Sequence, residues 1–105
     1  MSLPWAAPEI LCRNEATEKS DVYSFGVVLW ECLSRKVPWE GVADVRTLYR
    51  SVRDGQRPPV PEDAPRDLAA LARACWADDP AARPTLGGVL DGLALDVPRV
   101  AESGA

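Results

Sequence analysis

The sequence predicts an all-α domain organised around one buried helix. This helix is predicted for Lys19–Ser34, because its apolar residues occupy nearly every side of a helix, which is typical of a helix buried all round. No stretch of the chain alternates apolar and polar residues with the period of two that marks a half-buried strand. Ten prolines among 105 residues divide the chain into short segments, which favours short helices joined by loops.

The N-terminal third contains the boundary signals of the first two helices. Pro8 suits the first position of a helix, so one helical turn is predicted over Glu9–Cys12. A polar loop follows, and Thr17 or Ser20 then caps the central helix. The central helix is predicted to end before Pro38, because the residue that precedes a proline disfavours the helical conformation.

A further helix is predicted after the central one. Asp44 can cap it, it reaches Asp54, and Gly55 is a suitable C-terminal stop. Its apolar face has helical spacing and consists of Val45, Leu48, Tyr49 and Val52. A separate basic edge is formed by Arg46, Arg50, Arg53 and Arg57.

Two more helices follow a loop rich in proline at 56–65. Pro65 can open the first of them, whose apolar stripe consists of Leu68, Leu71, Ala72, Cys75 and Trp76. Thr85 caps the second, which reaches about Leu95 and is predicted to be buried on Leu86, Val89, Leu90 and Leu93. The domain is predicted to cover residues 1–97, and residues 98–105 form a small, polar tail that is expected to fray.

Composition argues against several classes of protein. The net charge of −4 argues against a nucleic-acid partner. The three cysteines are widely spaced and the chain has no histidine, so it lacks a zinc-binding pattern. An odd number of cysteines favours reduced thiols and a cytoplasmic location. The chain has neither a run of apolar residues long enough to cross a membrane nor a signal peptide, so no membrane partner is expected.

Three motifs, in the correct order and at the correct spacing, resemble those of the protein kinase family. Trp5–Glu9 (WAAPE) resembles the W-x-A-P-E that ends the activation segment of kinases. Ser20–Val27 (SDVYSFGV) is similar to the start of the kinase F helix. Cys75–Pro84 (CWADDPAARP) resembles the segment before the kinase I helix. Together these motifs are highly specific, whereas A-P-E alone would carry no weight.

The resemblance implies the C-terminal part of the kinase large lobe, from the end of the activation segment to the last helix. The flanking residues of these motifs look most like the tyrosine-kinase-like group, which implies specificity for serine and threonine. Structural roles are implied for the residues that match the family's motifs, namely Pro8, Glu9, Asp21, Gly26, Trp76 and Arg83.

Motifs for the chemistry of phosphoryl transfer are missing from this sequence. It contains no Gly-rich loop, strand lysine, H-R-D or D-F-G, the parts that hold ATP, magnesium and the substrate hydroxyl in kinases. No catalytic or metal-binding residue is therefore expected in this chain, and ATP and Mg²⁺ are expected only for the intact parent kinase. Two alternatives remain, a non-catalytic interaction module derived from a kinase lobe and a fragment of a pseudokinase.

Three of the charged residues have competing interpretations. The resemblance implies that Asp21 holds the catalytic loop, although a carboxylate in the first turn of a helix can also simply favour the helix dipole. The resemblance also implies that Glu9 pairs with Arg83, and a planar guanidinium suits such a bidentate carboxylate bridge; the alternative is two exposed charges of little consequence. Glu31 is either a structural or a substrate-facing carboxylate, and the sequence does not choose between these roles.

Two surfaces are candidates for interaction. The basic edge that includes Arg46, Arg50 and Arg53 is either a docking site for an acidic partner or a solvated helix face. The central helix is apolar on all sides, while the later helices each offer a single apolar stripe. An exposed apolar patch along Val27, Val28 and Trp30, with self-association through it, is therefore predicted for the chain alone. In the intact parent, the expected partners are protein substrates or regulators.

Overall fold

The computed structural model describes residues 3–42 and 44–96, and the side chains of residues 94–96 fall outside this description. The helices are η1 (Leu3–Trp5), α1 (Pro8–Arg13), α2 (Glu18–Ser34), α3 (Val45–Arg53), α4 (Arg66–Cys75), η2 (Pro80–Ala82) and α5 (Leu86–Asp96). The described residues include no strand, which confirms the predicted all-α class. The tail predicted for residues 98–105 lies outside the described residues.

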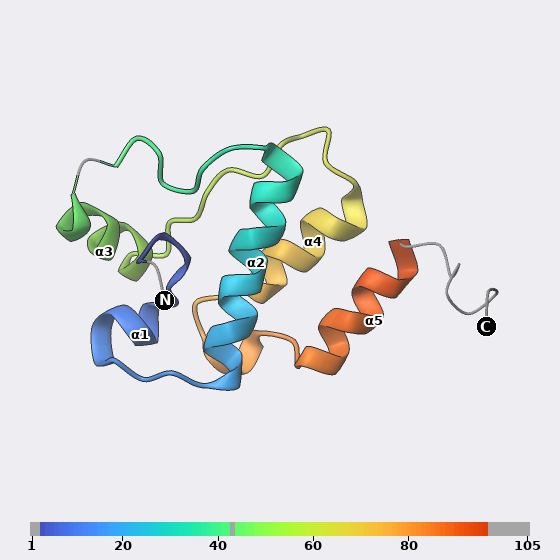
Figure 1. Ribbon diagram of the computed structural model, residues 1–105. Coiled ribbons are helices and arrows are strands. Elements are labelled where there is room, and N and C mark those ends of the chain that lie inside the picture. The colour runs from blue at the N-terminus through green and yellow to red at the C-terminus, as the bar shows by residue number, and fades with distance from the viewer. Residues whose placement is uncertain (1–2, 43, 97–105) are drawn as a thin grey trace.

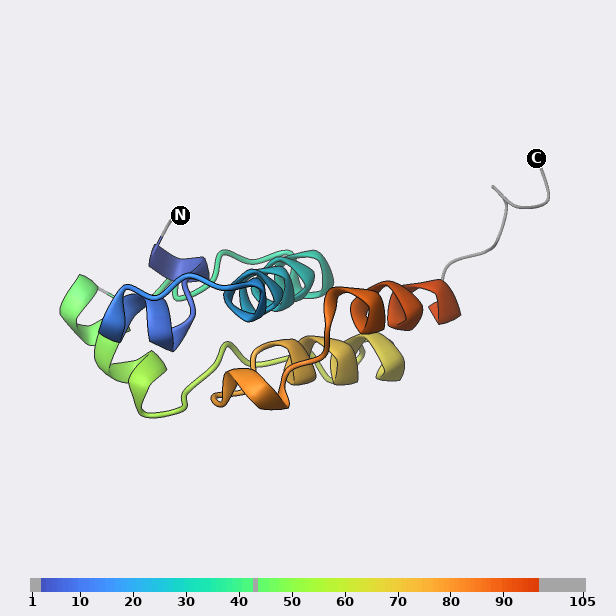
Figure 2. The ribbon, with the colours of Figure 1, turned by 90° about the horizontal axis from the view of Figure 1, so that it is seen from below.

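The helices form two groups around α2. Helices α1 and α3 lie on one side of it, and α4 and α5 lie on the other (Figure 1). Seen from below, α2 and α5 occupy one layer and α4 a second layer beneath them (Figure 2). The most extensive contact between two helices joins α2 to α4. Helix α2 is therefore the central element, as the sequence predicts.

Helix boundaries follow the predicted caps. Thr17 is the N-cap of α2 and forms a capping box with Ser20, in which each side chain accepts a hydrogen bond from the other residue's backbone N–H. The Asp44 carboxylate accepts a hydrogen bond of 2.7 Å from the backbone N–H of Thr47 at the start of α3. Thr85 accepts one of 3.0 Å from the N–H of Gly88 at the start of α5. These side chains satisfy N–H groups that have no partner within the helix.

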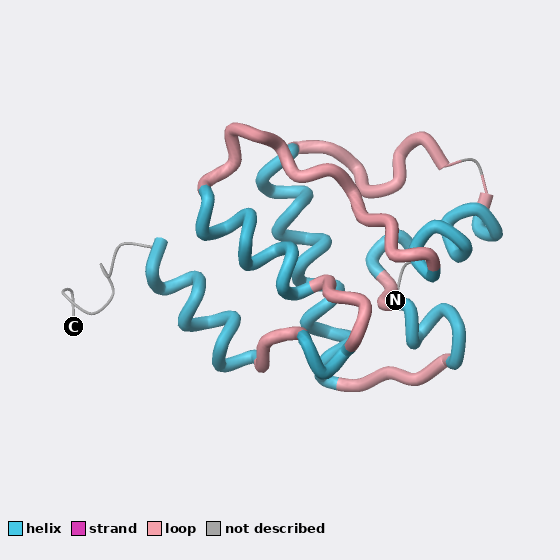
Figure 3. The backbone as a smooth tube through the Cα atoms, turned by 180° about the vertical axis from the view of Figure 1, so that it is seen from behind, coloured by secondary structure: helices cyan, strands magenta, loops and turns pink. Residues whose placement is uncertain are grey.

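The loops at 35–42 and 54–65 cross the same end of the molecule (Figure 3). One of them is tied to α2, because the indole Nε1 of Trp30 donates a 2.7 Å hydrogen bond to the carbonyl oxygen of Pro59. The loop rich in proline therefore runs along α2 without forming a helix, in agreement with the prediction.

The buried core has two parts. The larger lies between α2, α3 and the N-terminal segment and consists of Ala7, Tyr23, Val27, Trp30, Leu48, Val52 and Trp76. The smaller joins α2, α4 and α5 through Val22, Cys75 and Val89. Gly26 permits the close approach of α2 and α4, because a Cβ atom placed there would lie 2.7 Å from the Cβ of Cys75.

The prediction of an exposed apolar patch is wrong for two of its three residues, Val27 and Trp30, and correct for Val28. Val27 is fully buried and Trp30 is 3% exposed, whereas Val28 is 44% exposed. The loop at 54–65 covers the side of α2 that carries Trp30, a contact between distant segments that helical spacing alone does not reveal. The exposed side of α2 instead carries Val28 and Cys32.

Two predicted apolar stripes are narrower in the structure. On α5, Val89 is buried, but Leu86 and Leu90 are 47% and 66% exposed, because α5 contacts α4 and α2 along one side only. On α3, Leu48 and Val52 are buried while Val45 is exposed. The spacing of apolar residues therefore overestimated the buried width of both helices.

Candidate functional site

The side chain of Arg83 joins the loop before α5 to the first turn of α1. Its Nη1 lies 2.7 Å from Oε2 of Glu9, and its Nη2 lies 3.0 Å from Oε1, so the bridge is bidentate. The Arg83 side chain is fully buried and that of Glu9 is 8% exposed. The predicted contact between the two residues is therefore present, and the alternative of two exposed charges is wrong.

Further hydrogen bonds hold both partners of the bridge. Arg83 Nε donates to the carbonyl oxygen of Ala77 at 2.8 Å, and Nη1 also donates to the carbonyl oxygen of Lys19 at 3.0 Å. Lys19 Nζ in turn donates to the carbonyl oxygen of Arg83 at 2.6 Å. Ser20 Oγ donates to Glu9 Oε2 at 2.7 Å. Because these groups are satisfied, burial of the two charges is tolerated.

The bridge determines the protonation state of Glu9. Burial raises the pKa of the Glu9 carboxyl, but hydrogen bonds from Arg83 and Ser20 outweigh burial and hold the pKa below its ordinary value. The carboxylate is consequently charged near neutral pH, which is the form that pairs with a guanidinium.

Tyr23 lies beside the bridge and contacts two arginines. The guanidinium carbons of Arg83 and Arg57 lie 5.0 and 5.1 Å from the centre of the Tyr23 ring, within the range of cation–π interactions. Burial raises the pKa of Tyr23 to about 12. The Tyr23 hydroxyl is buried and has no hydrogen-bond partner among the described residues. Tyr23 therefore contributes its ring rather than its hydroxyl.

Arg57 does not belong to the basic edge to which the sequence assigned it. Its side chain is only 11% exposed, and it donates to the carbonyl oxygens of Trp76, Val52 and Gln56 at 2.9, 3.1 and 2.7 Å. The missed signal is the Pro58–Pro59 pair that follows it. Together with Gly55, which ends the predicted helix, these prolines place Arg57 in the loop beyond the helix that carries the other three arginines.

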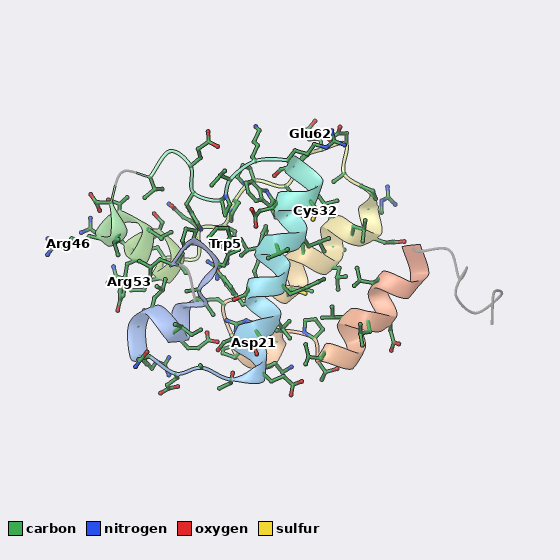
Figure 4. All side chains as sticks on the ribbon, viewed as in Figure 1. Trp5, Asp21, Cys32, Arg46, Arg53 and Glu62 are labelled. Carbon is green, nitrogen blue, oxygen red and sulfur yellow. The ribbon has the colours of Figure 1, made fainter. Side chains whose placement is uncertain are left out.

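The remaining residues of the three motifs have structural positions. Pro8 is the first residue of α1, Gly26 lies at the contact of α2 with α4, and Trp76 is 5% exposed at the end of α4. Asp21 is exposed near the start of α2 and is not part of the bridge (Figure 4). The structure thus brings Glu9 and Arg83 together and leaves Asp21 apart from them.

Glu31 contacts the N-terminal segment. The indole Nε1 of Trp5 donates a 2.5 Å hydrogen bond to Oε1 of Glu31. Sequence reasoning missed this partner of Glu31, because the two residues are 26 positions apart and no spacing rule connects them.

The three remaining arginines of the predicted docking edge are exposed on α3. Figure 4 shows Arg46 and Arg53 at the outer side of this helix, away from α2. Arg53 lies 3.5 Å from the Asp54 carboxylate, and both side chains are more than half exposed. An ion pair of this kind contributes little to stability.

A cavity of about 540 Å³ lies beside the bridge. It is lined by Pro8, Glu9, Cys12, Arg13, Glu15, Thr17, Arg53, Asp78, Asp79 and Pro80.

Among the described residues, no three histidine, cysteine, aspartate or glutamate side chains gather as metal ligands would. In the same part of the chain, no helix has the length and apolar character needed to cross a membrane.

Comparison with known proteins agrees with these motifs. The family profile described as protein tyrosine and serine/threonine kinase matches residues 1–93. The probable serine/threonine-protein kinase drkA of Dictyostelium discoideum is 40% identical over 89 residues, which are 85% of this chain and 14% of that protein. Mitogen-activated protein kinase kinase kinase 7 of Drosophila melanogaster is 39% identical over 85 residues, 81% of this chain and 12% of that protein.

A dual specificity protein kinase, shkD of Dictyostelium discoideum, is 37% identical over 87 residues, 82% of this chain and 12% of that protein. The chain thus spans only a small part of the length of the curated relatives it matches. The family profile, however, covers nearly the whole chain. This chain belongs to the protein tyrosine and serine/threonine kinase family and is a part of its catalytic domain.

Proposed function

We propose that the parent protein transfers the γ-phosphate of ATP to serine or threonine side chains of proteins, and that it belongs to the tyrosine-kinase-like group. The observation that carries this proposal is the sequence similarity of most of the chain to serine/threonine-protein kinases. The three kinase-like motifs, which occur in the correct order, support it. Free Cys12, Cys32 and Cys75 support a cytoplasmic location for the parent.

This chain contributes a scaffold to that reaction and no reacting group. This assignment rests on the sequence, which has no Gly-rich loop, strand lysine or D-F-G, the motifs that hold ATP and Mg²⁺ in kinases. We assign the motif residues Pro8, Glu9, Asp21, Gly26, Trp76 and Arg83 to the integrity of the lobe.

Expression of the chain alone and together with its upstream coding sequence tests the proposal. Mass spectrometry of a mixed-peptide substrate with ATP and Mg²⁺ should detect phosphoserine and phosphothreonine only with the longer protein. Degenerate H-R-D, D-F-G and lysine motifs upstream would instead identify a pseudokinase. An authentic start at Met1 would identify a stand-alone module, and phosphopeptides made by the chain alone would contradict its role as a scaffold.

A second proposal concerns docking, and it is favoured by the exposure of Arg46, Arg50 and Arg53 on one helix. Charges of one sign on a surface attract partners of the opposite sign, so an acidic segment of a substrate or regulator fits this edge. A fluorescent polyglutamate peptide should bind in low salt and lose affinity when the three arginines are changed to glutamine. Changing the exposed Arg73 of α4 serves as the control.

A third proposal is that the isolated chain associates with itself through apolar side chains of α2 and α5. Val28, Leu86 and Leu90 are between 44% and 66% exposed, and they lie on the two helices that share one layer. Exposed apolar side chains on neighbouring elements favour association.

A further inference from the structure

The segment Leu3–Trp5 is held to α2 at two points. Trp5 donates its indole N–H to Glu31, and Ser24 Oγ donates a 2.7 Å hydrogen bond to the carbonyl oxygen of Trp5. Ser24, the donor, and Glu31, the acceptor, are seven residues apart in α2. This spacing places them on the same side of the helix, two turns from each other. One side of α2 therefore holds both the side chain and the backbone of Trp5.

The held segment also forms a wall of an apolar pocket. Leu3 and Pro4 line a cavity of about 250 Å³ together with Trp39, Val42, Asp44, Val45 and Leu48. Trp5 itself packs against the larger core cluster while remaining partly exposed. The position of this wall thus depends on how firmly Trp5 is held.

The hydrogen bond from Trp5 to Glu31 has a charged acceptor. An indole offers a single donor that needs a partner when the ring is partly buried. A carboxylate is a charged acceptor, and hydrogen bonds to charged acceptors are shorter and stronger than neutral ones. Trp5 Nε1 and Glu31 Oε1 lie within hydrogen-bonding distance. One oxygen of Glu31 is consequently engaged within the chain.

We propose that Glu31 is a positioning residue, which together with Ser24 fixes Leu3–Trp5 on α2 and so sets one wall of the apolar pocket. Its role is to accept a hydrogen bond from Trp5, not to present a charge to a substrate. This inference does not depend on the proposed phosphoryl transfer.

Two substitutions of Glu31 distinguish a hydrogen-bond acceptor for Trp5 from a charge that faces a substrate. Glu31→Gln keeps an oxygen acceptor and removes the charge, whereas Glu31→Ala removes both. The indole N–H of Trp5 is the reporter, read by proton–nitrogen NMR and assigned from its disappearance in Trp5→Phe. The indole N–H of Trp30, which donates to Pro59, is the internal reference. Glu62→Ala, at an exposed site far from Trp5, is the matched control (Figure 4).

Solvent exchange of the Trp5 indole proton should rise about tenfold or more in Glu31→Ala, the scale of losing a hydrogen bond to a charged group. Exchange in Glu31→Gln should rise by about fivefold, less than in Glu31→Ala, because the amide keeps an acceptor oxygen but loses the charge. The Trp30 reference should not change in either variant. Unchanged exchange in Glu31→Ala would overturn the proposal. So would an equal rise in both Glu31 variants, which would make the charge decisive, or an equal rise at Trp5 and Trp30, which would indicate general loosening.

Discussion

Arg83 and Glu9 are 74 residues apart in the sequence and form a buried, bidentate ion pair. The pair connects the first turn of α1 to the loop before α5, and Ser20 of α2 adds a third contact. Each of the three motifs that resemble kinase segments contributes one of these residues. The bridge is therefore the point at which the three motifs meet.

Replacement of Arg83 by lysine should destabilise the fold although the charge is kept. A lysine ammonium cannot reproduce the bidentate geometry or the additional bond from Nε to Ala77. We expect a loss of about 1–3 kcal/mol in the free energy of unfolding, measured by urea titration. A double-mutant cycle with Glu9→Gln checks the assignment, because additive losses would mean that the two residues do not interact.

Acid should weaken the chain through Glu9. The pKa of Glu9 is lowered in the folded state, so its contribution is present above the unfolded-state pKa, about 4.3 for glutamate, and is lost as the pH falls through the folded-state pKa. Thermal melting between pH 7 and pH 3 should show less acid sensitivity in Glu9→Gln than in the unaltered chain. Parallel curves for the two proteins would rule out Glu9 as a source of the acid sensitivity.

The contact of α2 with α4 should not tolerate a side chain at position 26. Gly26→Ala would place a Cβ 2.7 Å from the Cβ of Cys75 and 3.1 Å from the carbonyl oxygen of Ala72. Overpacking of this kind costs about 1–3 kcal/mol. Gly87→Ala is the matched control, because its nearest neighbour would be the Thr85 hydroxyl at 3.8 Å. That variant should gain up to about 1 kcal/mol from helix propensity, and a similar gain in Gly26→Ala would contradict the close approach.

Arg57 and Arg53 should respond differently to the same substitution. Arg57→Lys loses contacts with Tyr23 and with the carbonyl oxygens of Trp76 and Val52, so we expect a loss of about 1–3 kcal/mol. Arg53 is 57% exposed, and Arg53→Lys should change stability by less than about 0.5 kcal/mol. Chemical denaturation measures the free energy of unfolding of both variants. Equal losses would contradict the inward contacts of Arg57 and place it on the exposed basic edge with Arg53.

Self-association should depend on the exposed apolar residues of α2 and α5. The unaltered chain is expected to sediment as a concentration-dependent oligomer and to bind the dye ANS. A variant with Val28→Gln and Leu90→Gln should shift toward monomer and bind less dye, because both side chains are exposed in the folded chain. Val37→Gln, at an exposed site in the loop after α2, is the control. A monomeric unaltered chain with no dye signal would show that these faces do not associate.

The sequence by itself determined the α-helices of this protein and the partners in its bridge, but not the short 3-10 helices η1 and η2. Local rules were sufficient for the all-α class, for the caps at Thr17, Asp44 and Thr85, and for the central place of α2, because these features depend on neighbouring residues and on helical spacing. The family motifs were sufficient to pair Glu9 with Arg83.

Only the tertiary structure decided which sides of the helices are covered. Val27 and Trp30 are buried because the core and the loop at 54–65 cover their side of α2. Val28 lies next to Val27 in the sequence, but it faces away from this side and is exposed. Arg57 turns inward to Tyr23, and Glu31 finds Trp5, through contacts between distant segments. The hydrophobic effect favours burial of any apolar side chain. It does not specify which neighbour provides the burial, and that depends on the packing of the whole chain.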